Sequence, residues 1–348
     1  MIINDRVYGT VKIDEPVLLE LINSKPIQRL KGINQAGAAQ YTIKGKNVSR
    51  YEHSLGVMIL LKKLNASIEE QIAGLLHDIP HTAFSHVIDF AFPSKDHDFH
   101  EKFHEKIINE SEIPNILKKH GIDTNKILDK HNFPLLEKKL PDLCADRIDY
   151  TLRDITAVYG NLTDLQSKSA IEIHKKITRY ISTLIVYKNE IIFSNKDMAK
   201  EFAEDFIKFD EESWSHPIEV TLFQLLADAM KLGLDSGILT EQDLFQNDEF
   251  VYNKLKNSNN QQILKKLEMI SPNLEIIDNP NDHDFFSKNK LRYVDPKFII
   301  MTKLQSNEAR DTTLQTKRVS EEFPDFLEFM NKHIEKIEKG NFIKIKKW

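Results

Sequence analysis

Apolar residues recur at helical spacing early in the chain, and this periodicity limits the possible folds more than any other feature. The pattern runs through 55–64 and returns over 72–76, after a capping-box signal formed by Ser67 and Glu70. Helices with one apolar face bury it by packing against one another. We therefore expect a helical bundle and a mainly α fold.

Other segments depart from the helical pattern. Residues 6–13 predict a short strand or hairpin, and 180–194 contain two β-rich runs around Lys188-Asn189, which is typical of a β-hairpin. Helical periodicity returns over 198–236, and short extended runs flank a helical one in the last third. We predict a helical core over 1–235 with a small hairpin insertion, and a small α+β subdomain over 236–348.

Composition excludes several classes of protein. With 348 residues, 41% of them hydrophobic, the chain can bury a substantial core. Its 48 basic and 53 acidic residues are interspersed, so we expect no stable nucleic-acid partner. The single cysteine, Cys144, excludes an intramolecular disulfide and suits a reducing compartment. Without a signal-peptide pattern or an apolar run near about 18 residues, the sequence indicates a cytoplasmic protein with no membrane partner.

A histidine and an aspartate close the second apolar helix. His77 and Asp78 follow the run IAGLL and precede Pro80, so both side chains leave a well-anchored helix end. Such a pair alone is more often a capped structural histidine than a metal ligand. Its meaning therefore depends on what the rest of the chain supplies.

Two further helical segments supply matching side chains. Arg50 and His53 are three residues apart and share one helix face, and Asp146, Tyr150 and Asp154 recur every four residues along another. Imidazole and carboxylate ligands together suit Fe, Mn, Co, Ni, Zn or Mg, and rigid helices present them well. The sequence thus predicts one divalent metal ion held between separate helices.

A competing motif lies at 100–104, where HEKFH fits the H-E-x-x-H helix of zinc proteases. The stretch is largely polar, and FHEK occurs at 99–102 and again at 103–106, so a local duplication explains the pattern. We interpret His104 as incidental and disfavour a metalloprotease.

Three motifs together carry a family resemblance. RYEHSLGV (50–57), LLHDIPHTAFSH (75–86) and DRIDYTLRD (146–154) resemble the HD-domain phosphohydrolases, particularly the deoxynucleoside triphosphate triphosphohydrolases related to the SAM-and-HD-domain protein. The resemblance covers roughly residues 6–160, and more loosely extends to about 235. It implies an HD-domain helical core, with Asp149 a neighbouring residue and the following metal ligands: His53, His77, Asp78 and Asp146.

The same resemblance implies a mechanism. A metal-activated water attacks the α-phosphorus of a nucleotide, with His81 near the scissile centre and His100, held by Glu101, as proton donor to the leaving group. The products are nucleoside and triphosphate. The resemblance also allows a second Mg²⁺ held with the substrate phosphates, and it implies a homo-oligomer. Because no SAM-like segment precedes residue 6, we expect no regulation through such a module.

Substrate-binding roles follow from the resemblance as well. Gln35 meets the sugar hydroxyl and Arg50 a phosphate, and the remaining contacts come from His86, Arg147, Tyr150 and Asp154. From the residues alone, Arg50 could instead form a surface ion pair, and His81 and His86 could be satisfied interior histidines.

Departures from the family pattern leave the substrate open. Ala36 stands where a leucine is usual, Trp214 replaces a tyrosine, and Phe206 aligns with an expected arginine. Arg147 replaces a lysine and supplies part of the lost charge, while Pro80 replaces a glycine. Two alternatives therefore stay open: a phosphatase or phosphodiesterase acting on another small ester such as a nucleoside monophosphate, and an inactive metal-binding regulatory protein.

Overall fold

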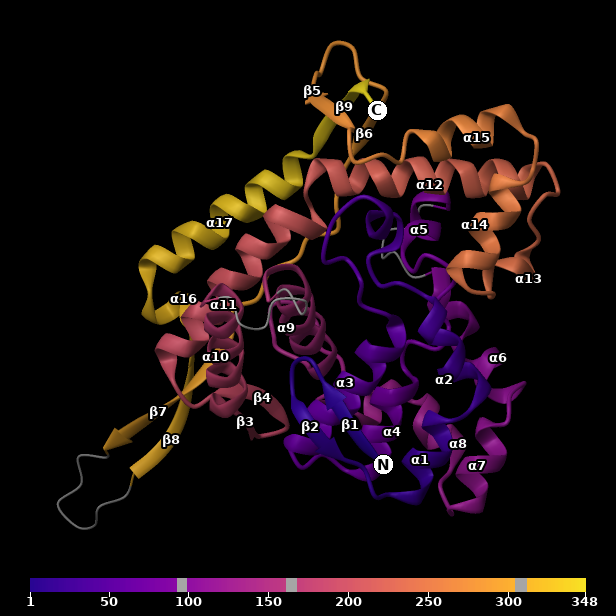
Figure 1. The fold of residues 1–348 in the computed structure, drawn as a ribbon. Helices are drawn as coiled ribbons and strands as arrows, with labels where there is room; N and C mark the ends of the chain where they lie inside the picture. The colour runs from indigo at the N-terminus through magenta and orange to yellow at the C-terminus, as the bar shows by residue number, and fades with distance from the viewer. Residues whose placement is uncertain (93–98, 161–167, 304–311) are drawn as a thin grey trace.

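The computed structural model describes residues 1–92, 99–160, 168–303 and 312–348 (Figure 1). The helices are α1 (Pro16–Ile22), α2 (Lys25–Arg29), α3 (Arg50–Lys63), α4 (Ile68–Leu76), α5 (Val87–Ala91), α6 (His104–Asn109), α7 (Ile113–Lys119), α8 (Thr124–Leu128), α9 (Ala145–Tyr159), α10 (Lys168–Thr183), α11 (Lys196–Phe209), α12 (Pro217–Asp235), α13 (Glu241–Leu244), α14 (Asp248–Lys256), α15 (Gln261–Glu268), α16 (Val319–Glu322) and α17 (Pro324–Lys339). Short 3₁₀ helices are η1 (Leu30–Gly32), η2 (Gly37–Tyr41), η3 (Phe99–Phe103) and η4 (Lys130–Asn132), and η6 (Asp210–Trp214) is a π-helix. The strands are β1 (Ile2–Asp5), β2 (Gly9–Lys12), β3 (Leu184–Tyr187), β4 (Glu190–Phe193), β5 (Glu275–Asp278), β6 (Phe285–Ser287), β7 (Lys297–Lys303), β8 (Thr312–Arg318) and β9 (Asn341–Lys347). The mainly α fold is confirmed.

Helix α3 is the central helix of the bundle. It begins at a capping box between Ser49 and Glu52, and 10 of its 14 residues are buried between α4 and α9. Gly56 permits the close approach to α9, because a Cβ there would lie 2.0 Å from Nη2 of Arg153. The capping box expected at the start of α4 is only half formed, since the Glu70 carboxylate accepts from the Leu135 amide at 2.7 Å instead.

The predicted β-hairpin is present but is part of a larger sheet. Strands β3 and β4 pair antiparallel, and the turn residues Lys188 and Asn189 have φ angles of 51° and 60°, which a two-residue hairpin turn of type I′ requires. The sheet order is β3-β4-β7-β8, and β4 pairs parallel with β7 from the last third of the chain. The hairpin therefore joins the two predicted domains.

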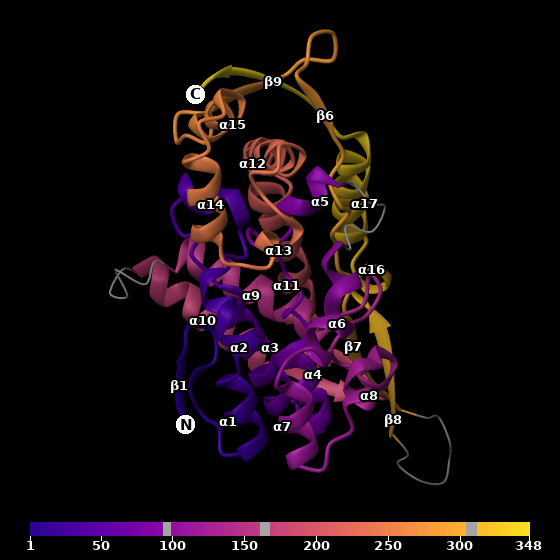
Figure 2. The same ribbon diagram turned by 90° about the vertical axis from the view of Figure 1, so that its right-hand side faces the viewer.

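Two other small sheets complete the described strands. β1 and β2 form an N-terminal hairpin that starts before the expected 6–13, and β5-β9-β6 lies at the far end of α17 (Figure 1). Seen from the side in Figure 2, α3, α4 and α9 lie beneath α12. Among the described residues, no helix is long and apolar enough to cross a membrane.

Buried apolar residues form two clusters. One joins α3, α4 and α9 to α11 and includes Val294, Phe298 and Phe326 from the C-terminal third. The other joins α12, α14 and α15 to Phe84 and Val87, near the predicted metal site. Both clusters therefore contain residues from each side of the predicted boundary at 235.

Candidate metal centre

The four predicted ligands converge at the meeting point of three helices. His53 comes from α3, His77 and Asp78 follow α4, and Asp146 lies in the first turn of α9. His53 Nε2 lies 3.0 Å from Asp146 Oδ1 and 3.6 Å from Asp78 Oδ2. His77 Nε2 lies 3.3 Å from Asp78 Oδ1 and 3.6 Å from Asp146 Oδ1. These two imidazoles and two carboxylates can face one divalent ion.

The histidine protonation pattern suits a cation. His77 Nδ1 lies 2.7 Å from the Gly74 carbonyl and donates to it, so the neutral ring carries a lone pair on Nε2. This Nε2 atom is buried and has no hydrogen-bond partner within the described residues. A buried polar atom without a partner costs free energy, and a metal ion between the carboxylates would remove that cost.

Electrostatics around the cluster follow from the carboxylates. Burial opposes a charge on His53, but hydrogen bonds with Asp146 and Asp149 raise its pKa to about 10. Burial also disfavours the charged form of Asp146, yet the hydrogen bond from His53 and the nearby His77 ring hold the pKa of Asp146 well below its usual value. The centre thus favours positive charge, which either a proton or a metal ion can supply.

Asp149 supports the metal centre from behind. Its carboxylate lies 2.8 Å from His53 Nδ1 and accepts from Arg153 Nε at 2.9 Å and Nη2 at 3.0 Å. Arg153 in turn pairs with Asp5 at 3.0 Å, and all these side chains are buried. The second nitrogen of His53 is thereby oriented for a ligand, in the manner of a carboxylate–histidine–metal arrangement. The sequence showed Asp149 only as a neighbour of the ligands.

Arg50 is buried beside the ligands. Its Nη1 donates to Asp78 Oδ2 at 2.7 Å, and its Nε donates to Ser85 Oγ at 2.9 Å. With only 5% of its surface exposed, it does not form a surface ion pair. Within the described residues Nη2 makes no hydrogen bond, so a planar donor group is available for an anion.

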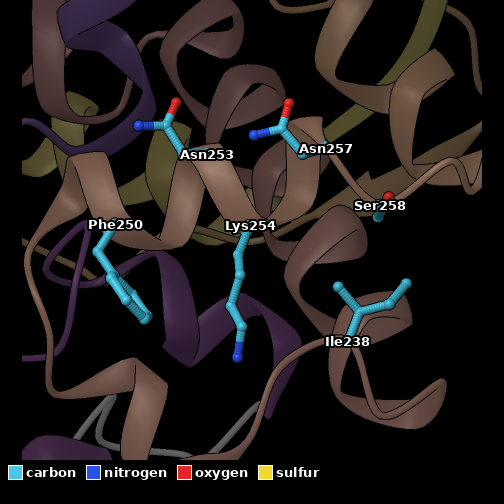
Figure 3. A pocket seen from close by; sticks show the side chains of 6 residues that line it. All are labelled: Ile238, Phe250, Asn253, Lys254, Asn257 and Ser258. Atoms are coloured by element: carbon cyan, nitrogen blue, oxygen red, sulfur yellow. The ribbon is translucent and has the colours of Figure 1, made fainter.

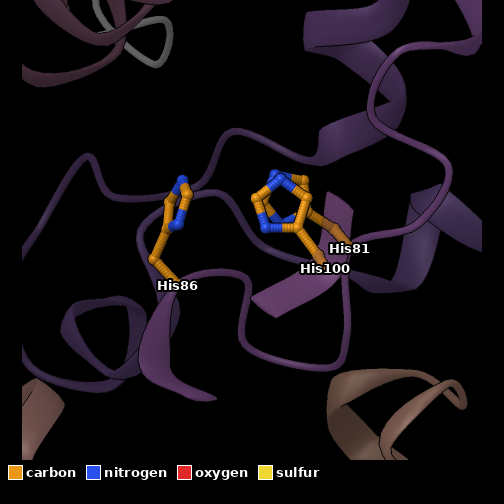
Figure 4. Close-up of side chains that lie close together, drawn as sticks. All are labelled: His81, His86 and His100. Atoms are coloured by element: carbon orange, nitrogen blue, oxygen red, sulfur yellow. The ribbon is translucent and has the colours of Figure 1, made fainter. Parts of the chain in front are cut away.

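Three histidines lie close together (Figure 4), and His81 joins them to the ligand cluster through Asp78. The rings of His81 and His100 stack with centroids 3.8 Å apart and planes 19° apart, and His86 meets His81 edge-on at 4.8 Å. His81 Nε2 lies 3.2 Å from Asp78 Oδ1, and His86 Nδ1 lies 2.8 Å from Asp89 Oδ2. Burial lowers the pKa of all three, to about 3 for His100. One ring nitrogen from each of the three histidines lies within 4.8 Å of the others, so the three side chains can contact one ligand together.

The structure does not bring Glu101 to His100. Both lie on η3, where successive side chains point about 120° apart. Glu101 is exposed and its carboxylate lies 3.1 Å from Lys130 Nζ. The expected support of His100 by Glu101 is therefore absent from this structure.

The H-E-x-x-H segment is divided between η3 and α6. His104 begins α6, and its Nε2 lies 3.2 Å from the Leu76 carbonyl. His104 thus has a structural partner, in agreement with its interpretation as incidental.

The expected substrate-binding residues occupy different positions around the centre. Asp154 accepts from Trp214 Nε1 at 2.8 Å, and Tyr150 meets the Trp214 ring edge-on at 5.1 Å. Arg147 lies in α9 and donates to the backbone carbonyls of Lys138 and Asp142, so much of its donor capacity is used by the loop that precedes this helix.

Gln35 and Phe206 occupy positions that the family resemblance connects with substrate binding. The side-chain oxygen of Gln35 is buried without a hydrogen-bond partner among the described residues, which leaves an acceptor for a hydroxyl. Phe206 is fully buried and packs against Tyr150 and Trp214. The position at which the resemblance expects an arginine is therefore part of the core.

Asp248 is a site residue that the sequence did not indicate. It begins α14 and accepts from the amides of Phe84 at 2.6 Å and Asn34 at 2.9 Å, and from Gln40 Nε2 at 2.8 Å. Phe84 and Ser85 both have positive φ angles, 61° and 56°, which are strained for these residues. Asp248 therefore holds the strained loop that carries Ser85, the partner of Arg50.

A surface pocket lies apart from these groups. Figure 3 shows that it is formed by α14 and adjoining loops, with no histidine or carboxylate in its lining. It is lined by Ile238, Phe250, Asn253, Lys254, Asn257 and Ser258. We give it no catalytic role, because its lining has no metal ligand and its one titratable side chain, Lys254, pairs with Asp243 at 2.7 Å.

Comparison with known proteins identifies related sequences. A family model described as "HD domain" matches residues 50–154. An uncharacterised protein, YdhJ of Bacillus subtilis, is 42% identical over 301 residues, covering 86% of this chain and 89% of that protein. The metal-dependent phosphohydrolase cns2 of Cordyceps militaris is 32% identical over 250 residues, 71% of this chain and 70% of its own. The deoxynucleoside triphosphate triphosphohydrolase SAMHD1 of Bos taurus is 36% identical over 106 residues, 26% of this chain and 18% of its own.

Proposed function

This chain belongs to the HD-domain metal-dependent phosphohydrolases, and on that basis we propose that it hydrolyses deoxynucleoside triphosphates to nucleoside and triphosphate. The hydrolase class follows from the family. The nucleotide substrate is supported by the likeness to the cattle triphosphohydrolase, which is confined to 106 residues. A second Mg²⁺ with the substrate, a homo-oligomer and a cytoplasmic location stay predictions.

One observation carries the proposal. His77 Nε2 is buried without a partner in the described chain, and it lies within 3.6 Å of carboxylate oxygens from Asp78 and Asp146. A divalent ion held by His53, His77, Asp78 and Asp146 would lower the pKa of a bound water and neutralise phosphoryl charge.

The surrounding residues would bind and orient the substrate. Arg50 would donate from Nη2 to a phosphate oxygen, because its other donors hold Asp78 and Ser85 in place. Gln35 would bind a sugar hydroxyl with its buried oxygen. His81 would contact the reacting phosphate from its place beside Asp78.

His100 would hold the proton for the leaving oxygen. In the free protein burial lowers its pKa to about 3, so the ring is neutral near pH 7. Negative phosphate groups bound next to the ring would favour its protonated form and raise that pKa. The proton would then pass from the ring to the departing oxygen.

A second candidate is a phosphatase or phosphodiesterase acting on a nucleoside monophosphate or a similar small ester. Its support is the buried Phe206 at the position of the expected arginine, which removes one contact to a polyphosphate. Product analysis separates the two reactions, because only the first releases intact triphosphate.

The test uses the metal-loaded protein on a panel of nucleotides. We expect the wild type to turn over substrate. His77→Ala and Asp78→Ala should lose the bound metal, and their activity should fall about a thousandfold or more. His120→Ala is a matched control, since His120 pairs with Glu20 away from the centre and should keep full activity.

Two results would contradict the proposal. Full turnover in both His77→Ala and Asp78→Ala would show that the proposed metal centre is not needed for the reaction. A wild type that binds metal but hydrolyses no phosphate ester would favour the inactive regulatory alternative.

A further inference from the structure

A segment from the C-terminal third runs beside the ligand-bearing helix α9. Asn289 Nδ2 donates to the Ser215 carbonyl at 3.0 Å, and the Asp295 amide donates to the Pro141 carbonyl at 3.0 Å. Pro141 lies just before the N-terminus of α9. The segment is therefore fixed at both ends against elements that flank this helix.

The anchor at Ser215 lies next to residues expected to bind the substrate. Ser215 directly follows Trp214, whose indole nitrogen donates to Asp154 in the second half of α9. From 289 to 295 an extended chain reaches at most about 20 Å. From 145 to 154 the helix rises roughly 14 Å. The segment is thus long enough to run alongside α9 from 145 to 154, and too short to extend far from this helix between its two anchors.

Two cations lie between the anchors, Lys290 and Arg292. The Arg292 carbonyl is 2.9 Å from His333 Nε2, which fixes the backbone midway. Its guanidinium Nη1 is 3.9 Å from Asp210 Oδ1, a long contact that leaves other donors for a ligand. Arg292 also lies close enough to Tyr150 for its charge to lower the pKa of that phenol, although burial raises it overall.

Lys290 lies close enough to Asp146 and His86 for their charges to interact. Burial by surrounding protein and the charge of Arg292 lower the pKa of Lys290, while Asp146 acts in the opposite direction. Lys290 nevertheless remains exposed to solvent. The charge of Lys290 also helps to lower the pKa of His86, after the larger effect of burial.

We propose that Lys290 and Arg292 bind the phosphate groups of the substrate that lie beyond the reacting phosphorus. This inference rests on the proposed function and narrows it to nucleoside di- or triphosphates. Phosphate oxygens are strong acceptors, and a guanidinium and an ammonium beside a metal centre are suited to them. These two cations would supply the contacts that the buried Phe206 cannot make.

The experiment compares Lys290→Gln and Arg292→Gln with the wild type, all loaded with metal. Inorganic tripolyphosphate serves as the probe, and its binding is measured by calorimetry. We expect each variant to weaken binding about tenfold, because each loses a charge-assisted hydrogen bond. For a nucleoside triphosphate, KM should rise about tenfold with kcat nearly unchanged, whereas KM for a nucleoside monophosphate should change little.

Lys288→Gln is the matched control, since Lys288 is an exposed cation of the same segment. Unchanged tripolyphosphate binding in both test variants, or an equal loss in Lys288→Gln, would overturn the inference. A wild type that does not bind tripolyphosphate would also overturn it. Binding that both variants lose, in a protein that hydrolyses no nucleotide, would keep the anion site and reject the proposed function instead.

Discussion

The substitution Asp149→Asn tests whether the metal centre depends on the buried carboxylate behind it. Asp149 touches no metal in the proposed arrangement, but it orients His53 through a 2.8 Å hydrogen bond and neutralises Arg153 through two more. Asparagine keeps the shape and one acceptor oxygen, while it removes the charge. We therefore expect weaker metal binding and lower stability without a change of fold.

The magnitude follows from the partners that remain. Breaking a buried ion pair costs about 3–5 kcal/mol, and Arg153 keeps Asp5 at 3.0 Å, so we expect about 3 kcal/mol. Loss of a carboxylate that orients a histidine ligand weakens metal binding about 10- to 100-fold. Burial opposes the charge on Asp149, but Arg153 and His53 lower its pKa, so this stabilisation is present at neutral pH and lost as the pH falls below about 4.

The assay is a metal titration against a competing chelator at pH 7, together with urea unfolding of the metal-free protein. Asp228→Asn is the control, because Asp228 pairs with Lys266 at a partly exposed site and should change neither quantity by much. Gly56→Ala offers a second approach, since a Cβ there would lie 2.1 Å from Asp149 Oδ1 and displace the same carboxylate. Wild-type metal affinity and stability in Asp149→Asn would refute the reasoning.

Three further predictions concern other contacts of the site. Arg50→Lys should keep the metal but lower kcat/KM about 10- to 100-fold in steady-state assays, because an ammonium cannot hold Asp78 and a phosphate in one plane; an unchanged value would exclude phosphate contact by Arg50. Asp248→Asn should lower the free energy of unfolding by about 1–3 kcal/mol in urea and lower kcat, because the amide group turns a donor toward backbone amides. Unchanged stability and unchanged kcat would contradict a positioning role for Asp248. Burial lowers the pKa of His104 to about 4, although the hydrogen bond to the Leu76 carbonyl acts in the opposite direction. The unfolded imidazole therefore takes up a proton first, and wild-type stability should fall by about 2–3 kcal/mol as the pH drops from about 6.5 to 4. His104→Gln keeps a donor without titrating, so urea unfolding should show a smaller fall, and an equal fall would assign the effect to other groups.

Sequence reasoning succeeded where the signal was local. Helical periodicity and the turn residues Lys188 and Asn189 predict elements that the structure contains, because both depend on neighbours only a few residues apart. The proposed metal ligands also lie in local motifs. Each motif places its side chain on a defined helix face, and the family resemblance supplied the pairing between helices.

The residues that were missed act over long separations. Asp248 binds the amide of Phe84, which is 164 positions away, and any residue other than proline could offer that amide. The half-formed capping box has the same origin, since Glu70 turns to the amide of Leu135. A backbone partner leaves no mark in side-chain identity, so only the folded chain reveals these contacts.

The same contacts change how the two parts of the chain should be understood. A boundary near 235 separates two sequence textures, yet Asp248 holds the loop that carries the partner of Arg50, and Asp295 fixes a cationic segment beside α9. Sheet pairing between β4 and β7 crosses the boundary as well. In our proposal the C-terminal third is therefore part of the catalytic structure: the first part of the chain would supply the metal ligands, and the second would set the loop geometry and the charge that selects among phosphate substrates.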